Sequence, residues 1–135
     1  MNIAIVGLDY DFVVYFSKSL AVKMKMKFVD FENEFEKEML TTDNLEILNG
    51  QAEVKEAVFL NQLAQQKNIV LSISNESFLS NRNYEVLNDF FIILIEKKED
   101  KKILKNIQKI IKKHCKIAIK QENININEIL NIIKG

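Results

Sequence analysis

The clearest chemical spacing in this chain lies in residues 3–14, IAIVGLDYDFVV. A short apolar run leads into Gly7 and a helical pattern starts just beyond it, which is the layout of the phosphate-binding motif G-x-x-x-x-G-K-[ST]. Counting on from that glycine places Phe12 at the second glycine, Val13 at the lysine and Val14 at the metal-binding Ser or Thr. Only the first glycine of the motif is present. The sequence therefore predicts a degenerate phosphate loop.

The residue types at these positions oppose phosphate binding for physical reasons. A phosphate loop points successive backbone N–H groups inward, which needs glycine-type backbone conformations at the positive end of a helix. Bulky and β-branched side chains disfavour those conformations by roughly 1–2 kcal/mol each. Asp9 and Asp11 add like charge, since a carboxylate about 4 Å from a phosphate opposes it by roughly 4 kcal/mol at an effective dielectric of about 20. We expect Phe12, Val13 and Val14 to form a first helical turn, capped by one of the two aspartates.

A second pair of carboxylates follows the next apolar run, at Asp30 and Glu32. If both runs are parallel strands, this pair meets Asp9 and Asp11 at the carboxyl edge of one sheet, where open α/β sheets bind ligands. Four carboxylates offer the oxygen ligands that magnesium and calcium prefer, with Asp9 and Asp30 as the first candidates. The other interpretation is that all four are helix caps and solvent-exposed loop residues. We expect no resident metal.

The apolar pattern along the chain predicts alternating strands and helices. Five short apolar runs predict strands at Ile3–Val6, Lys27–Val29, Ile69–Ile73, Phe90–Ile95 and Lys116–Ile119. The third and fourth runs are apolar at nearly every position, as in strands covered on both faces. Helical spacing fills the intervals and includes a short helix that Ser80 can cap, an amphipathic stripe at 103–111 and a closing helix from Ile126. Such alternation predicts βαβ units and a parallel sheet in one α/β domain, residues 1–135.

Composition narrows the class of protein. The chain has 135 residues, of which 47% are hydrophobic, and this suffices for a buried core. It has no proline and three glycines, which argues against an all-β fold built on tight hairpins. Its one cysteine, Cys115, excludes an intrachain disulfide and a cysteine-based zinc cluster. The apolar runs are too short to span a membrane and no signal-peptide pattern is present, so we expect a soluble cytoplasmic protein.

The charges are unevenly distributed, although 19 basic and 19 acidic residues balance. Nine acidic residues against two lysines lie in residues 28–58, whereas residues 97–120 hold ten lysines against two acidic residues. Such asymmetry marks either a surface for a partner or two solvated helix faces. Stacking aromatics are absent from the lysine-rich segment, which argues against nucleic acid as its partner. For His114 and Cys115, near its end, we expect a surface histidine and a buried apolar cysteine rather than a catalytic pair.

Several segments resemble the shikimate kinase family in order and spacing. They are the opening strand with Gly7, SKSLAVKMKMKFVDFENEFE at 17–36, NIVLSISNESFLSNRNYEVL at 68–87, FFIILIEKKED at 90–100 and IAIKQENININEILNIIK at 117–134. The resemblance covers almost the whole chain. It implies a three-layer α/β/α fold with a five-stranded parallel sheet of strand order 2-3-1-4-5.

The resemblance also assigns functional positions. Asp30 stands for the first carboxylate of the family's Asp-x-Asp motif, which helps to hold magnesium and substrate, and Glu32 stands for the second. Ser74, Asn75 and Glu76 replace the Gly-Gly-Gly turn that cradles shikimate. An acidic pocket edge argues against shikimate, which is itself an acid. It leaves a small polar or cationic ligand as an alternative.

The arginine positions of the family differ as well. Glu53 aligns with the substrate-binding arginine, although a small shift would place Lys55 there. The family's lid is an arginine-bearing insertion, whereas KKEDKK at 97–102 is the whole connection here between the fourth strand and the next helix. The single arginine, Arg82, is expected on the helix after the third strand. The sequence therefore predicts a chain without a lid.

These differences predict a kinase fold without kinase activity. With no lysine, metal-binding hydroxyl or arginine finger, little remains to stabilise a transferring phosphoryl group. We expect a catalytically inactive binding or regulatory module, with no cofactor and an unidentified protein partner. Fold analogy alone would place it in aromatic amino-acid biosynthesis. The alternative is a divergent ATP-dependent small-molecule kinase that binds ATP and magnesium at a non-standard site.

Overall fold

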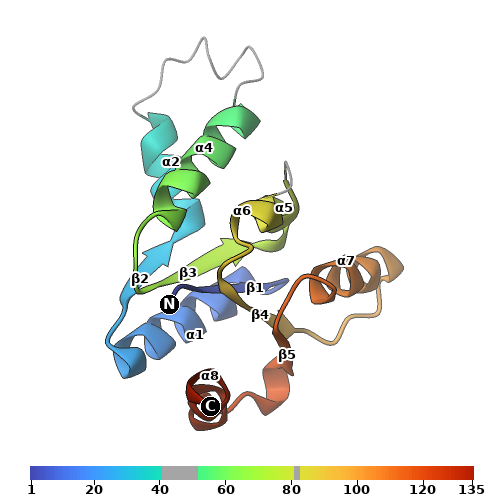
Figure 1. The fold of residues 1–135 in the computed structure, drawn as a ribbon. Helices are drawn as coiled ribbons and strands as arrows, with labels where there is room; N and C mark the ends of the chain where they lie inside the picture. Colours follow the sequence, from blue (N-terminus) through green and yellow to red (C-terminus); the bar gives the residue numbers. More distant parts are fainter. Residues whose placement is uncertain (41–51, 81–82) are drawn as a thin grey trace.

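A parallel β-sheet forms the centre of the molecule in a computed structural model that describes residues 1–40, 52–80 and 83–135 (Figure 1). Its strands are β1 (Ile3–Gly7), β2 (Lys27–Asp30), β3 (Ile69–Ser74), β4 (Phe91–Glu96) and β5 (Ile117–Lys120). All four strand pairs are parallel and the order is β2-β3-β1-β4-β5. The predicted strand order is confirmed, and each predicted strand end lies within one residue of the observed one.

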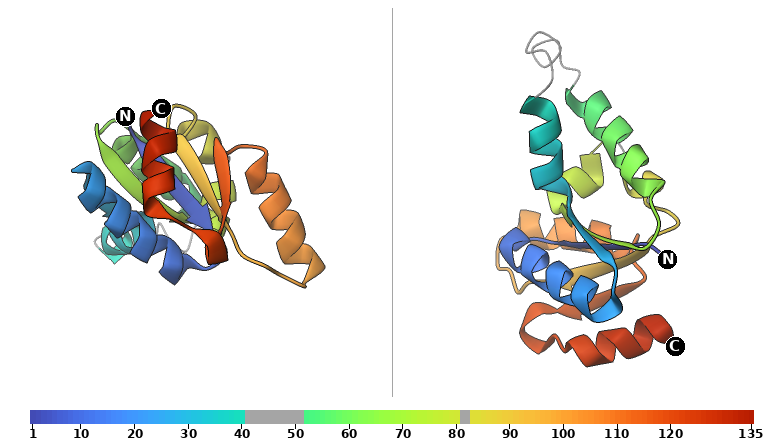
Figure 2. Two further views of the ribbon diagram at one scale, coloured as in Figure 1. Left: turned by 90° about the horizontal axis from the view of Figure 1, so that it is seen from below. Right: turned by 90° about the vertical axis from the view of Figure 1, so that its left-hand side faces the viewer.

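Helices cover both faces of the sheet. The helices are α1 (Tyr10–Met24), α2 (Phe31–Leu40), α4 (Ala52–Ala64), α5 (Asn75–Leu79), α6 (Asn83–Val86), α7 (Lys102–Lys112), the 3-10 helix η2 (Gln121–Asn123) and α8 (Ile126–Lys134). Helices α1 and α8 pack on one face, and the helices from α2 to α7 pack on the other (Figure 2). The result is the expected three-layer α/β/α arrangement.

Side chains of the central strands alternate between two apolar layers. In β1, Ile3 and Ile5 face the α1–α8 layer, while Ala4 and Val6 face the opposite layer. All four side chains are fully buried. The near-continuous apolar runs of the sequence follow from this arrangement, because a strand with helices on both faces has no solvated side.

Helices α2 and α4 lie side by side and extend beyond the edge of the sheet (Figure 1). Three phenylalanine rings join them, with centroids 5.8 Å apart for Phe31 and Phe35 and 6.0 Å apart for each of these with Phe59. Phe31 is fully buried and fixes the base of the pair on the core. In the first turn of α2, Glu32 lies at the carboxyl edge of the sheet, where it accepts a hydrogen bond from Ser74 at the end of β3.

The segment after β3 differs from the sequence prediction. Ser80 was expected to begin a short helix, but it is the C-terminal cap residue of α5, a helix that the sequence did not predict. Helix α5 starts directly at Asn75 because the Ser74 hydroxyl accepts a hydrogen bond from Ser77 N at 3.1 Å. The prediction for Arg82 lies outside the described residues. Within those residues, no helix has the length and apolarity needed to cross a lipid bilayer.

Candidate functional site

The connection between β1 and α1 consists of two residues, Leu8 and Asp9. Asp9 caps α1, since its Oδ1 accepts a hydrogen bond from Phe12 N at 3.3 Å. Phe12, Val13 and Val14 are all helical, as the sequence predicts for a first turn capped by an aspartate. The positive-φ non-glycine residues of the described chain are Lys25 and Asn68, so residues 8–14 contain none. This junction therefore offers no left-handed loop for an anion.

Close packing at this junction explains why residue 7 is a glycine. A Cβ atom built on it would lie 2.8 Å from Ile95 O and 3.0 Å from Val13 Cγ2. Val13 is fully buried against this glycine. The one glycine left of the phosphate-binding pattern is thus required by the close approach of β1, β4 and α1, whether or not a phosphate binds.

Tyr10, in the first turn of α1, reaches across the sheet edge to Asp30 at the end of β2. Its hydroxyl donates to Asp30 Oδ1 and lies 3.1 Å from Ser72 Oγ on the intervening strand β3. Asn33 N donates to the same Asp30 oxygen at 3.2 Å. Burial, and next the hydrogen bond to Asp30, raise the pKa of Tyr10 above its ordinary range, so the hydroxyl keeps its proton and remains a donor.

The hydrogen bond between Tyr10 and Asp30 was not predicted from the sequence. The ring of Tyr10 packs against the core. Only the strand order brings the start of α1 next to the end of β2, because β3 lies between β1 and β2. No local pattern in the sequence indicates that Tyr10 and Asp30 are neighbours.

A second polar group, which we call the inter-helix cluster, comprises Glu32 of α2, Ser77 of α5, Asn83 of α6 and Glu56 of α4. Glu32 Oε1 accepts hydrogen bonds from Ser77 Oγ at 2.5 Å and from Ser74 Oγ at 2.7 Å. Short bonds of this kind are typical of a hydroxyl donating to a carboxylate. Glu32 Oε2 is buried and has no hydrogen-bond partner.

Asn83 joins Ser77 to Glu56 within the inter-helix cluster. Its Nδ2 donates to Ser77 O at 2.6 Å and to Glu56 Oε1 at 2.8 Å. Asn83 is fully buried, and its Oδ1 has no partner. Burial raises the pKa of Glu56, and the nearby charges of Glu32 and Glu53 act in the same direction, while the hydrogen bond from Asn83 opposes them.

The structure separates the residues that the sequence grouped in one pocket. Glu32 and Ser74 are bonded to each other, whereas Asp30 belongs to the contact with Tyr10. Glu53 and Glu76 are exposed in the first turns of α4 and α5. Asn75 is buried. Residues 74–76, which replace the family's glycine turn, are thus the cap and first turn of α5. The helix can start there because the Ser74 hydroxyl accepts a hydrogen bond from Ser77 N.

Glu56, Ser77 and Asn83 were not singled out from the sequence. Glu56 lies three residues after Glu53, so the helical spacing of α4 could have indicated it as a second candidate on the same helix face. Ser77 and Asn83 gave no such signal. As for metals, the described ranges contain no group of three or more His, Cys, Asp and Glu side chains placed to hold an ion.

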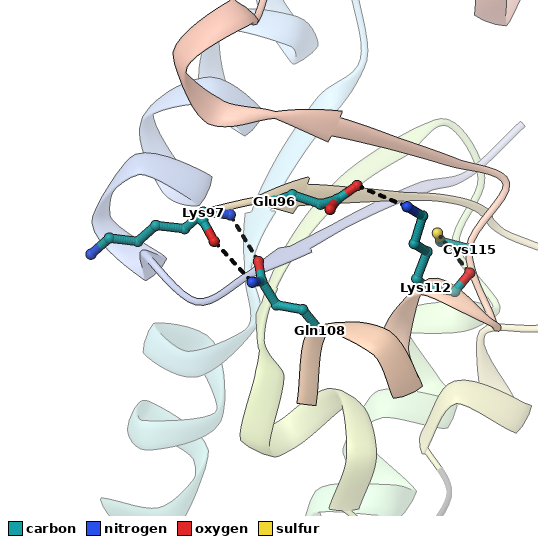
Figure 3. Close-up of polar contacts among 5 residues, drawn as sticks. All are labelled: Glu96, Lys97, Gln108, Lys112 and Cys115. Carbon is teal, nitrogen blue, oxygen red and sulfur yellow. Dashed lines mark hydrogen bonds and ion pairs between the residues drawn. The ribbon is translucent and has the colours of Figure 1, made fainter. Parts of the chain in front are cut away.

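The connection between β4 and α7 is residues 97–101. Gln108 of α7 holds its start, accepting from Lys97 N at 2.8 Å and donating to Lys97 O at 2.9 Å (Figure 3). Glu96 and Lys112 form an ion pair at 3.4 Å beside them (Figure 3). Glu99 Oε1 accepts from the amides of residues 100 and 101, both at 3.1 Å. The two Gln108 bonds hold the start of the connection against α7, and the Glu99 bonds lie within the connection.

His114 and Cys115 lie at the opposite edge of the sheet, just before β5. The exposed His114 ring stacks on Tyr84 with centroids 4.1 Å apart, beside a groove of about 580 Å³. Cys115 is half-buried, donates to Lys112 O at 3.2 Å, and packs against the core (Figure 3). Burial raises the pKa of its thiol, which keeps it protonated and weakly nucleophilic. Neither residue contacts the inter-helix cluster.

Comparisons with known proteins agree with this architecture. The chain superimposes on shikimate kinase from Bacteroides thetaiotaomicron with a TM-score of 0.74 at 13% identity, covering 100% of this chain and 99% of that one. The chain has the shikimate kinase fold. The Acinetobacter baumannii enzyme, in complex with shikimate, gives a TM-score of 0.75 at 18% identity over 98% of this chain and 92% of that one. The Aquifex aeolicus enzyme gives 0.74 at 18% over 100% and 97%.

Sequence comparisons give no further relatives. No protein-family model matches the chain, and no curated protein sequence matches it either. At the identities of these structural matches the shared property is the fold, and activity has to be argued from the residues themselves.

Proposed function

We propose that this protein is a catalytically inactive shikimate kinase-like protein that acts as a binding or regulatory module. The observation that carries the proposal is the β1–α1 junction, where only two residues separate β1 from α1. Val13, at the position of the phosphate-binding lysine, is fully buried against Gly7. A lysine, a metal-binding hydroxyl and a loop of inward-pointing amides are the parts that bind the phosphates in this fold. All three are replaced here by an ordinary capped helix.

The contacts of Asp30 support the same proposal. In the family this carboxylate helps to hold magnesium and substrate, but here its Oδ1 accepts hydrogen bonds from Tyr10 and from Asn33 N. The fixed connection at 97–101 supports it too, because a lid has to move in order to close over a nucleotide. A protein partner, by fold analogy an enzyme of aromatic amino-acid biosynthesis, is the expected target of such a module.

The alternative function is a divergent ATP-dependent small-molecule kinase that binds ATP and magnesium at another place. One observation favours it, a hollow of about 340 Å³ at the carboxyl ends of β4 and β5. Its lining residues are Glu96, Lys97, Lys98, Lys120 and Glu122. Three lysines offer charge for phosphates, although the two glutamates offset much of it. Under this alternative, replacing Lys97 and Lys120 with Gln abolishes nucleotide binding.

An assay of phosphoryl transfer tests the proposal. The purified protein is incubated with ATP, magnesium and shikimate, and ADP release is followed by a coupled reaction, with an active shikimate kinase as the positive control. We expect no ADP release above the protein-free background. Shikimate-dependent ADP release that disappears in Asp30→Asn would establish the kinase alternative.

A further inference from the structure

The groove beside His114 lies at the amino ends of β4 and β5, on the edge of the sheet opposite the β1–α1 junction. Its volume of about 580 Å³ falls within the range of about 300–1,000 Å³ that is typical of small-molecule sites. Three segments line it, which are α6 with the turn after it, the start of β4, and the turn between α7 and β5. None of the described residues that line it belongs to the junction or to the inter-helix cluster. The groove is therefore a separate candidate site.

The floor and one wall of the groove are fixed by the fold. Phe90 and Ile92, which line the groove, are both buried in the apolar core. Lys116 N donates to Ile92 O at 2.8 Å and so ties the turn before β5 to the start of β4. His114 N donates to Ile111 O at 2.9 Å, which closes a turn at the end of α7. The groove is thus largely formed before a ligand binds, as is usual for small-molecule sites.

An aromatic stack forms another part of the wall. The rings of Tyr84 and His114 both line the groove, with centroids 4.1 Å apart and an angle of 27° between their planes. Tyr84 in turn packs against Phe78 with centroids 6.1 Å apart, and Phe78 is fully buried. The exposed His114 ring is therefore held by a stack that reaches the core. A flat ring suits such a wall, because aromatic pairs gain more than the burial of their apolar area alone would give.

The charge of the groove favours an anion. The described charged residues that line it are Lys113, Lys116 and Glu85, which leave one excess positive charge when His114 is neutral. Neither lysine forms an ion pair with another described residue. Both side chains are exposed, and their flexible four-carbon stems let the ammonium groups adjust to a ligand. A monoanion matches this balance of charge, whereas a polyphosphate carries several negative charges and exceeds it.

We propose that this groove binds a small aromatic carboxylate. The ligand's ring packs against the wall formed by Tyr84 and His114, and its carboxylate is attracted by the positive charge of Lys113 and Lys116. The inference goes beyond the proposed function and does not depend on it, because the groove lies at the edge of the sheet away from the degenerate phosphate loop.

The chain has a single histidine, which makes the groove directly observable by proton NMR. The Hε1 and Hδ2 signals of His114 are followed while indole-3-acetate is added at constant pH and ionic strength. We expect a saturable shift of both signals, because the ring current of an indole packed beside the imidazole changes their resonance frequencies. Indole-3-acetamide lacks the charge and cyclohexylacetate lacks the flat ring, so each should bind more weakly than indole-3-acetate.

Titration calorimetry with indole-3-acetate tests the two lysines. Its dissociation constant should rise roughly two- to fivefold in Lys113→Gln and in Lys116→Gln, as for loss of one solvent-exposed ion pair, and about tenfold in the double variant. Lys102→Gln removes an exposed lysine of α7 that does not line the groove, and it should bind as the wild type does. All three lysines are exposed, so we expect these variants to fold.

Several results would overturn the inference. Absence of any shift of the His114 signals with indole-3-acetate would do so, and so would equal affinity for indole-3-acetamide or cyclohexylacetate. An unchanged affinity in the double lysine variant would place the ligand elsewhere on the protein. An equal shift with inorganic phosphate would mean that the groove accepts any anion, which contradicts the assignment of an aromatic carboxylate. Magnesium-dependent binding of ATP that leaves the His114 signals unmoved would refute the proposed function and leave this inference intact.

Discussion

The β1–α1 junction and the inter-helix cluster lie along the carboxyl edge of the same sheet, yet different groups hold their carboxylates. At the junction, Asp9 caps α1 through Phe12 N, and the Asp30 oxygen that faces Tyr10 also accepts from Asn33 N. In the cluster, the side chains of Ser74, Ser77 and Asn83 donate to Glu32 and Glu56. Both regions keep a buried acceptor without a donor, Gln121 Oε1 beside Asp9 and, in the cluster, Glu32 Oε2 and Asn83 Oδ1. Local spacing along the chain thus sets the helix cap of the junction, whereas the packing of four helices sets the contacts of the cluster.

The largest expected effect comes from restoring the missing lysine. Val13→Lys places an ammonium in a fully buried position against Gly7. We expect the free energy of unfolding to fall by several kcal/mol, because a buried charge without a partner is poorly solvated. Urea unfolding followed by circular dichroism measures it. Val14→Lys, one residue on at a half-buried site, is the control and should cost clearly less. A stable Val13→Lys protein that binds ATP would show that the junction can open.

A methyl group on Gly7 should have the next largest effect. In Gly7→Ala the new Cβ meets the backbone oxygen of Ile95 at 2.8 Å, and a backbone atom yields less readily than a flexible side chain. We expect a loss of about 3 kcal/mol, the upper part of the usual range for overpacking. The midpoint of urea unfolding reports it. An unchanged midpoint would mean that β1, β4 and α1 are not packed as closely as described.

Removal of the Tyr10 hydroxyl should have a smaller effect. Tyr10→Phe takes one donor from the Asp30 carboxylate and leaves Asn33 N as its partner. We expect the free energy of unfolding to fall by about 1.5–2 kcal/mol, the lower part of the range for a hydrogen bond to a charged group. Tyr15→Phe is the matched control on the same helix, because Tyr15 is 66% exposed and should tolerate the change. Equal stability of the two variants would contradict the role given to Tyr10.

The smallest effect concerns the pH dependence of stability. The folded protein raises the pKa of the Glu56 carboxyl, chiefly by burial, so the folded state holds this proton more tightly than the unfolded state does. The contribution is fully present below the ordinary pKa of glutamate and is lost as pH rises through the raised value. In Glu56→Gln this part of the fall in stability with rising pH should disappear. Unfolding curves across the acidic range measure it, with Glu36→Gln expected to keep the wild-type profile.

Sequence reasoning predicted the fold better than the site. The apolar runs placed every strand end within one residue, because strands with helices on both faces leave a continuous signal. A cap by Asp9 or Asp11 was predicted as well, since capping depends on local spacing, and the structure shows that Asp9 is the one. Ser77, Asn83 and the hydroxyl of Tyr10 were not, because each of them bonds to a residue in another helix or strand. Such contacts follow from strand order and helix packing, which no local pattern encodes.

The most direct test of the central claim, that the phosphate site is closed, is thermal unfolding of the wild-type protein with and without ATP and magnesium. A ligand present at about 100 times its dissociation constant would stabilise the fold by roughly 2.7 kcal/mol. The capped helix at Tyr10 and the buried Val13 predict no change in melting temperature at millimolar nucleotide. A clear magnesium-dependent rise in melting temperature would contradict the account and support the kinase alternative.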